Sequence, residues 1–125
     1  MLRHKSWDKY EIALLIECYV NVTSQGKELE TELIKLSKNL RSMAVHQGET
    51  IDETYRNLNG MHWQYQFIKS AFNNSLVGSK TPPKLFIEIV QLFHSDKHKF
   101  DAILMEAHRL AEDYTSTMEN KKEEF

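Results

Sequence analysis

Residues 27–46, KELETELIKLSKNLRSMAVH, place an apolar side chain at alternating spacings of four and three residues. The positions that form this pattern are Leu29, Leu33, Leu36, Leu40 and Met43. Because an α-helix turns once every 3.6 residues or so, the spacing puts all of them on one narrow stripe, with charged residues on the other faces. The stretch therefore predicts an amphipathic helix that ends at Gln47-Gly48, with glycine in the usual C-terminal position.

Helical periodicity continues on both sides of this stretch. Ser6 is a suitable N-cap for a helix from about Trp7 to Val20, whose apolar centre predicts burial between neighbours. Thr50-Ile51-Asp52-Glu53 has the pattern of a capping box and predicts the start of another helix. We expect that helix to continue through Asn59-Gly60 to about Phe72, although glycine there costs about 1 kcal/mol relative to alanine.

Two further helices are predicted after a polar loop at residues 73–80. One follows Thr81-Pro82-Pro83, with threonine as its cap, and the other begins at Ser95-Asp96. Strand-like alternation is not found, so the sequence predicts an all-α fold, a bundle of about five helices. We expect a single helical domain over residues 1–114, with a helix-turn-helix-like tri-helical core at about 6–72 and a C-terminal helical extension at about 81–114. Residues 115–125 are predicted to be a charged tail or linker.

Composition limits the classes of function. The 125 residues are 41% hydrophobic and 27% charged, which is typical of one globular domain. Cys18 lies in an apolar run and is predicted to be a buried core thiol, which fits a reducing compartment. Without a signal-peptide pattern or a long apolar run, we expect a cytoplasmic location and no membrane partner. A formal net charge of −2 argues against DNA binding by charge alone, but not against a local basic face.

Motifs of catalysis are not found in the sequence. It has no phosphate-binding glycine loop, no nucleophile elbow and no paired C-x-x-C, so we expect no enzymatic activity and no cofactor. His94 and His98 have a spacing that could present two imidazoles to a metal on one helix. The helix start predicted at Ser95-Asp96 separates them, and surface histidines are the favoured interpretation, so no metal site is predicted.

The segment from Leu36 to Lys69 has the composition of a recognition surface. Asparagine and glutamine can pair with adenine in the major groove, whereas arginine and lysine bind guanine or phosphate. Two helices joined by a glycine-containing turn match a helix-turn-helix. The candidate nucleic-acid-binding residues are Lys38, Arg41, Arg56, Asn57, Asn59, Gln64 and Lys69. An alternative from the residues alone is a helical protein-interaction or dimerisation module, with Met61, Trp63 and Phe67 as its contact patch.

A family resemblance rests on several short motifs spread over about residues 5–112. They are Trp7 with Glu11, Leu14-Leu15 and Tyr19, Leu36-Ser37 to Leu40-Arg41, Tyr55-Arg56-Asn57, Asn59-Gly60-Met61, and Thr81-Pro82-Pro83-Lys84-Leu85-Phe86 with Phe100. Together they resemble a Myb/SANT-like helix-turn-helix module at the N-terminus of larger bacterial restriction, defence or mobile-element proteins. The resemblance implies a targeting domain that binds double-stranded DNA, with catalysis in a separate domain. It also implies a core role for Trp7 and places Arg56, Asn57 and Asn59 on or near a recognition helix.

Overall fold

The computed structural model describes the backbone of residues 5–74 and 80–123, and the side chains of these ranges up to Ala111. Within these ranges there is no β-strand. The helices are α1 (Lys9–Gln25), α2 (Leu29–His46), α3 (Leu58–Asn73), α4 (Lys84–Ser95) and α5 (Lys97–Glu123). The predicted all-α bundle of about five helices is therefore confirmed.

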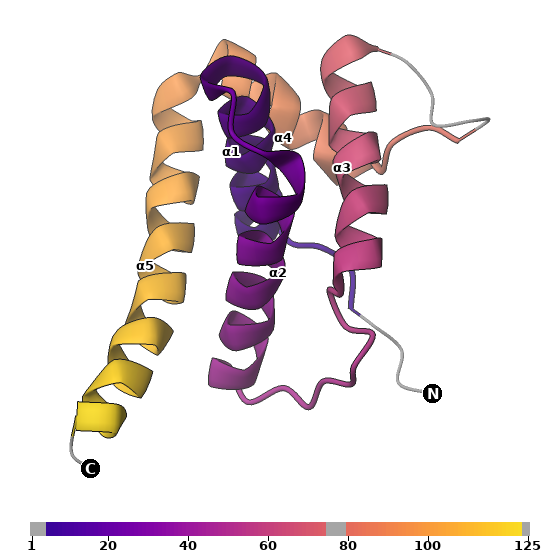
Figure 1. Cartoon of the computed structure of the whole chain (residues 1–125). Coiled ribbons are helices and arrows are strands. Elements are labelled where there is room, and N and C mark those ends of the chain that lie inside the picture. Colours follow the sequence, from indigo (N-terminus) through magenta and orange to yellow (C-terminus); the bar gives the residue numbers. More distant parts are fainter. Residues whose placement is uncertain (1–4, 75–79, 124–125) are drawn as a thin grey trace.

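Helix α1 occupies the centre of the bundle. It contacts each of the other four helices, whereas α3 and α5 do not contact one another. Figure 1 shows α3 and α5 on opposite sides of the α1–α2 pair, with α4 passing between them at one end. This position explains why α1 is buried without interruption from Glu11 to Ile16, as its apolar sequence predicted.

The core is built from aliphatic and aromatic side chains of all five helices. The largest of those that are almost completely buried are Ile12, Leu15, Ile16, Leu33, Leu40, Met61, Ile68 and Phe100. Burying one such side chain contributes about 1.5–3 kcal/mol. The predicted stripe of α2 is confirmed, because Leu33, Leu36, Leu40 and Met43 are buried and Leu29 packs at the edge of the core.

Helix α1 begins two residues later than predicted and ends five residues later. Its N-cap is Asp8 rather than Ser6, because Asp8 Oδ1 accepts a hydrogen bond from the backbone N–H of Glu11 at 2.9 Å. The carboxylate of Glu11 accepts in return from the backbone N–H of Asp8 at 3.1 Å, which completes a capping box. The helix ends at Gln25, where Gly26 takes a left-handed conformation with φ +68° that other residues adopt only with strain.

Helix α3 begins at Leu58, so the prediction of a helix start at Thr50 is wrong. Asp52 Oδ1 instead accepts the backbone N–H groups of Thr54 and Tyr55, each at 3.0 Å, and forms a local turn. Arg56 then has φ +48°, a left-handed conformation that interrupts any helix arriving from residue 50. Asn57 is the actual N-cap and Gly60 lies in the first turn, through which the helix continues.

The last two helices differ from prediction at their ends. Pro83 occupies the N-cap position of α4 without a side-chain hydrogen bond, so the prediction of Thr81 as the cap is wrong. Helix α5 begins at Lys97, directly after the break predicted at Ser95-Asp96, and continues to Glu123. Most of the predicted tail is thus helical, while residues 75–79 of the predicted loop and 124–125 lie outside the described residues. In the described part of the chain, no helix has the length and apolar character needed to span a membrane.

Candidate nucleic-acid interface

Arg56 lies inside the protein rather than on an exposed helical face. Its Nε donates to Glu11 Oε2 at 2.9 Å, and its Nη2 donates to Glu11 Oε1 at 3.2 Å and to the carbonyl of Lys5 at 3.1 Å. The guanidinium carbon is also 4.9 Å from the ring centroid of Trp7 and 4.6 Å from that of Tyr55. The prediction that Arg56 faces a partner is therefore wrong, because its donors and both ring contacts are internal.

Arg41 and Asn57 hold the segment that joins α2 to α3. One guanidinium nitrogen of Arg41, Nη1, donates to the carbonyls of Asp52 (3.2 Å) and Tyr55. Asn57 Oδ1 accepts from the backbone N–H of Gly60 at 2.8 Å as the cap of α3. Both side chains are half-buried, so they fix where α3 starts rather than projecting freely into solvent as predicted.

The solvent side of α3 carries a row of polar and aromatic residues, which we call the α3 face. It consists of Asn59, His62, Trp63, Gln66 and Lys69, all exposed except the half-buried His62. These positions recur every three or four residues and therefore share one side of the helix. The structure thus keeps Asn59 and Lys69 of the predicted set on one exposed surface, and leaves Gln64 half-buried beside it.

His62 and Gln66 were not among the predicted site residues. The signal that could have found them is the phase of the helix, because Met61, Tyr65 and Ile68 are buried on the opposite side. Met61 is 1% exposed, so its predicted role in a protein contact patch is wrong. Phe67 packs against the core, and of the three predicted patch residues Trp63 is the one that remains well exposed, at 57%.

Trp63 lines a shallow depression in the α3 face. Asn59, His62, Trp63 and Gln66 line this hollow, which has a volume of about 180 Å³. None of the four side chains is a carboxylate, a lysine or an arginine. An indole ring flanked by amides can stack on a flat partner and donate or accept hydrogen bonds beside it.

Acidic residues are distributed unevenly along the chain. Residues 54–87 contain no aspartate or glutamate, and their basic residues are Arg56, Lys69, Lys80 and Lys84. The stretch therefore has a formal charge of +4. Since the whole chain has a formal charge of −2, the remaining residues carry −6. Glu11 neutralises Arg56, and Lys84 Nζ lies 3.9 Å from Glu88, so the exposed Lys69 and Lys80 give this stretch its outward positive charge.

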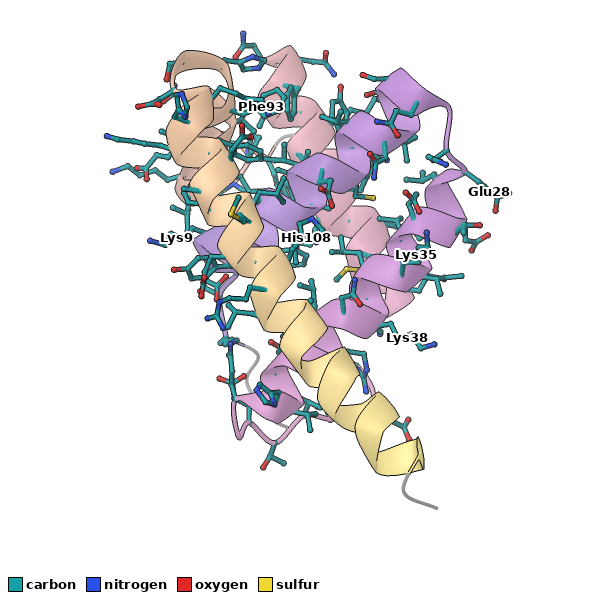
Figure 2. All side chains as sticks on the ribbon, turned by 90° about the vertical axis from the view of Figure 1, so that its left-hand side faces the viewer. Lys9, Glu28, Lys35, Lys38, Phe93 and His108 are labelled. Atoms are coloured by element: carbon teal, nitrogen blue, oxygen red, sulfur yellow. The ribbon has the colours of Figure 1, made fainter. Side chains whose placement is uncertain are left out.

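Lys38 is exposed, but it is not part of the α3 face. It projects from α2 beside a separate pocket between α1, α2 and α5 (Figure 2). The structure therefore does not bring all the predicted nucleic-acid-binding residues together. Of the seven, Asn59 and Lys69 lie on the α3 face and Gln64 lies beside it. Arg41, Arg56 and Asn57 stabilise the start of α3, and Lys38 lies elsewhere.

The described residues offer little for metal binding or nucleophilic catalysis. Among them, no group of three histidine, cysteine or carboxylate side chains is placed to hold a metal ion. His94 lies at the end of α4 and His98 at the start of α5, both exposed. Burial, together with the nearby carboxylates of Glu32 and Glu17, raises the pKa of Cys18 from 9.0 to about 12, so its thiol stays protonated at neutral pH.

The fold and this surface define an all-α five-helix domain with an acid-free, amide-rich helix exposed on one side. No protein-family model, curated protein or solved structure matches the chain. The resemblance to Myb/SANT-like modules stays a prediction that depends on the quoted motifs.

Proposed function

We propose that this chain is a DNA-binding module that places the α3 face against double-stranded DNA. The observation that carries the proposal is the absence of carboxylates from residues 54–87, in a chain whose other residues carry −6. A carboxylate near a phosphate is repelled, whereas lysine side chains that bind phosphate release counterions and favour association. The net charge of the chain is therefore a poor guide to the charge of this surface.

The dimensions of the α3 face suit a groove. The rise of an α-helix is about 1.5 Å per residue, so Asn59 and Gln66 are about 10 Å apart along α3, comparable to three base pairs of DNA. The major groove is about 12 Å wide and admits one helix. Asn59 and Gln66 would then contact base edges, while Lys69 would bind a phosphate. Arg56 acts as a positioning residue, since its contacts with Glu11 are internal.

Binding of a fluorescent duplex, followed by anisotropy over a range of salt concentrations, tests the proposal. Lys69→Ala is expected to weaken binding to every sequence and to reduce the slope of log K against log salt by about 0.9. Gln66→Ala is expected to weaken binding while leaving that slope unchanged, because an amide releases no counterion. Lys99→Ala removes a cation from α5, which does not contact α3, and is the matched control.

Two results would count against DNA binding. A folded wild-type domain that binds no duplex at low salt would refute it. Equal losses for Lys69→Ala and Lys99→Ala would show that binding depends on general charge rather than on the α3 face.

Trp63 favours a second candidate function, a protein-interaction or dimerisation module. An indole that is 57% exposed beside the amides of Asn59 and Gln66 resembles the centre of a protein interface, where tryptophan is enriched and charge is depleted. Light scattering after size exclusion distinguishes the candidates. Concentration-dependent dimers that are lost in Trp63→Ala would support self-association, and a monomer at all concentrations would exclude it.

A further inference from the structure

A pocket separate from the α3 face lies on the side of the bundle that α3 does not reach. It is a pocket of about 360 Å³ between α1, α2 and α5, on the side that faces the viewer in Figure 2. Small-molecule sites begin at about 300 Å³, so the pocket is large enough for a small metabolite. Leu14, Cys18 and Leu36 supply an apolar wall, and all three are at most 5% exposed.

Two carboxylates converge on this pocket from different helices. Glu17 Oε2 of α1 lies 2.9 Å from His108 Nε2 of α5, so this pair spans two of the helices that form the pocket. Glu32 of α2 accepts from Asn21 Nδ2 at 3.4 Å, a long hydrogen bond that leaves acceptor capacity on the carboxylate. Both carboxylates line the same pocket as the buried Cys18 thiol, and both raise the pKa of that thiol.

The cations of the pocket lie farther out than its acids. The Glu32 side chain is 11% exposed and the Glu17 side chain 33%, whereas the Lys35 side chain is 71% exposed. Lys35 Nζ is 3.4 Å from Glu32 Oε2, and the exposed Lys38 lies on the same side of α2 (Figure 2). Glu32 is therefore the least exposed charged group among these residues, and the pocket combines it with exposed lysines and one apolar wall.

We propose that this pocket binds a small zwitterion of the α-amino-acid type, with its ammonium group directed inward. The ammonium would contact Glu17 and Glu32, and the carboxylate would lie near Lys35 and Lys38 at the mouth. An apolar side chain would pack on the wall that contains Leu14. A plain anion would meet two carboxylates inside and a plain cation would pass two lysines, so a molecule with both charges complements the site better.

Titration of isotope-labelled protein with leucine, observed by NMR, tests the proposal. Leucine is expected to shift the imidazole signals of His108 and the side-chain amide signals of Asn21 and Asn39, all of which line the pocket. N-acetyl-leucine has no ammonium and is expected to bind at least about tenfold more weakly, a difference of about 1.4 kcal/mol. Leucinamide, which lacks the carboxylate, should lose less affinity than N-acetyl-leucine does, because the lysines at the mouth are exposed to water.

Variants of the pocket residues provide the second arm of the test. Glu32→Gln is expected to weaken leucine binding about tenfold, and Lys38→Gln about threefold, in line with the weak contribution of exposed charges. Lys38 is fully outside the core, so Lys38→Gln tests the site even if Glu32→Gln disturbs folding. Lys99→Gln, a lysine outside the pocket, should bind leucine like the wild type.

Three outcomes would overturn the proposal. They are a folded wild-type protein whose pocket signals do not shift with millimolar leucine, binding of N-acetyl-leucine as tight as that of leucine, and shifts that map outside the pocket. Neither DNA-binding variant, Lys69→Ala nor Gln66→Ala, changes a residue of this pocket. Failure here is therefore distinguishable from failure of the proposed DNA binding.

Discussion

The guanidinium of Arg56 and the carboxylate of Glu11 form a buried ion pair across 45 residues of sequence, with Nε and Oε2 2.9 Å apart. Each side chain is 5% exposed. Glu11 also accepts a hydrogen bond from the backbone of Asp8, so one carboxylate both caps α1 and fixes the residue two positions before α3. The contact therefore ties the segment that leads into α3, and with it the start of the α3 face, to α1.

Loss of Arg56 is expected to destabilise the domain strongly. In Arg56→Ala the Glu11 carboxylate stays buried without its counter-charge, which typically costs about 3–5 kcal/mol. The double variant Glu11→Gln with Arg56→Met buries no charge. Its loss in the free energy of unfolding should be smaller than the sum of the losses in the two single variants. Urea denaturation of the four proteins measures this coupling, and strictly additive losses would contradict it.

An exposed ion pair supplies the control for that cycle. Lys84 Nζ lies 3.9 Å from Glu88 Oε1, and the Lys84 side chain is 91% exposed. Water screens such a pair, so Lys84→Ala is expected to change the free energy of unfolding by less than about 1 kcal/mol. If Lys84→Ala lost as much free energy of unfolding as Arg56→Ala, burial of the Arg56–Glu11 pair would not explain the loss in Arg56→Ala.

Arg41→Met is expected to loosen the segment that joins α2 to α3. The substitution removes the guanidinium that donates to the carbonyls of Asp52 and Tyr55, at a cost of about 1–3 kcal/mol. Hydrogen exchange of residues 50–57 should become faster, while the salt dependence of any DNA binding stays unchanged. Lys38→Met, at an exposed position of the same helix, is the control and should leave exchange in that segment as it is.

The sequence predicts those parts of the fold that depend on contacts within one helix. The stripe of α2 is visible because Leu33 and Leu40 repeat at helical spacing, and the burial of α1 follows from its continuous apolar run. The capping box at Asp8 and Glu11 has the same spacing as the pattern at Thr50 and Glu53, so local sequence does not tell which pattern is used. What the local sequence also does not show is that Glu11 has a partner, Arg56, far along the chain.

The candidate site shows the same limit. Asn59 and Lys69 are correctly predicted to be exposed, because they are polar and lie in a helix under either start position. His62 and Gln66 are missed, although both share one side of the helix with Asn59 and Lys69 at spacings of three or four residues, whichever residue starts the helix. The sequence alone predicts a partner-facing Arg56, because nothing local shows that its guanidinium contacts Glu11.

Stability is expected to fall at alkaline pH because of Cys18. Burial raises the pKa of its thiol from 9.0 to about 12, so the unfolded chain loses this proton at a lower pH than the folded one. The protonated thiol therefore contributes stability that is fully present below pH 9 and is lost as the pH rises toward 12. Urea midpoints measured at increasing pH should begin to fall just above pH 9.

Cys18→Ala separates this effect from that of the tyrosines. Burial raises the pKa values of Tyr55 and Tyr65 from 10.0 to about 12, so their contributions are lost only above pH 10. The variant should be less stable at neutral pH, because a buried side chain is shortened, but its urea midpoint should stay level up to pH 10. An equal fall in both proteins between pH 9 and 10 would contradict the assignment to Cys18.

Trp63 is expected to report on the α3 face by its own fluorescence. The chain has two tryptophans, and Trp7 is half-buried, with its ring 6.0 Å from that of Phe86. In Trp7→Phe the emission comes from Trp63 alone, so it should be red-shifted and strongly quenched by acrylamide. In Trp63→Phe the remaining emission should be bluer and better protected, and the free energy of unfolding should change by less than about 0.5 kcal/mol.

The same single-tryptophan protein tests which partner the surface binds. In Trp7→Phe, saturating duplex DNA should protect Trp63 from acrylamide, because the indole would lie between α3 and the groove. Dilution of the free protein should leave its quenching unchanged if the chain is a monomer, and should increase it if Trp63 is buried between two copies. A Trp63 signal that responds to neither duplex nor dilution would remove this residue from both proposed interfaces.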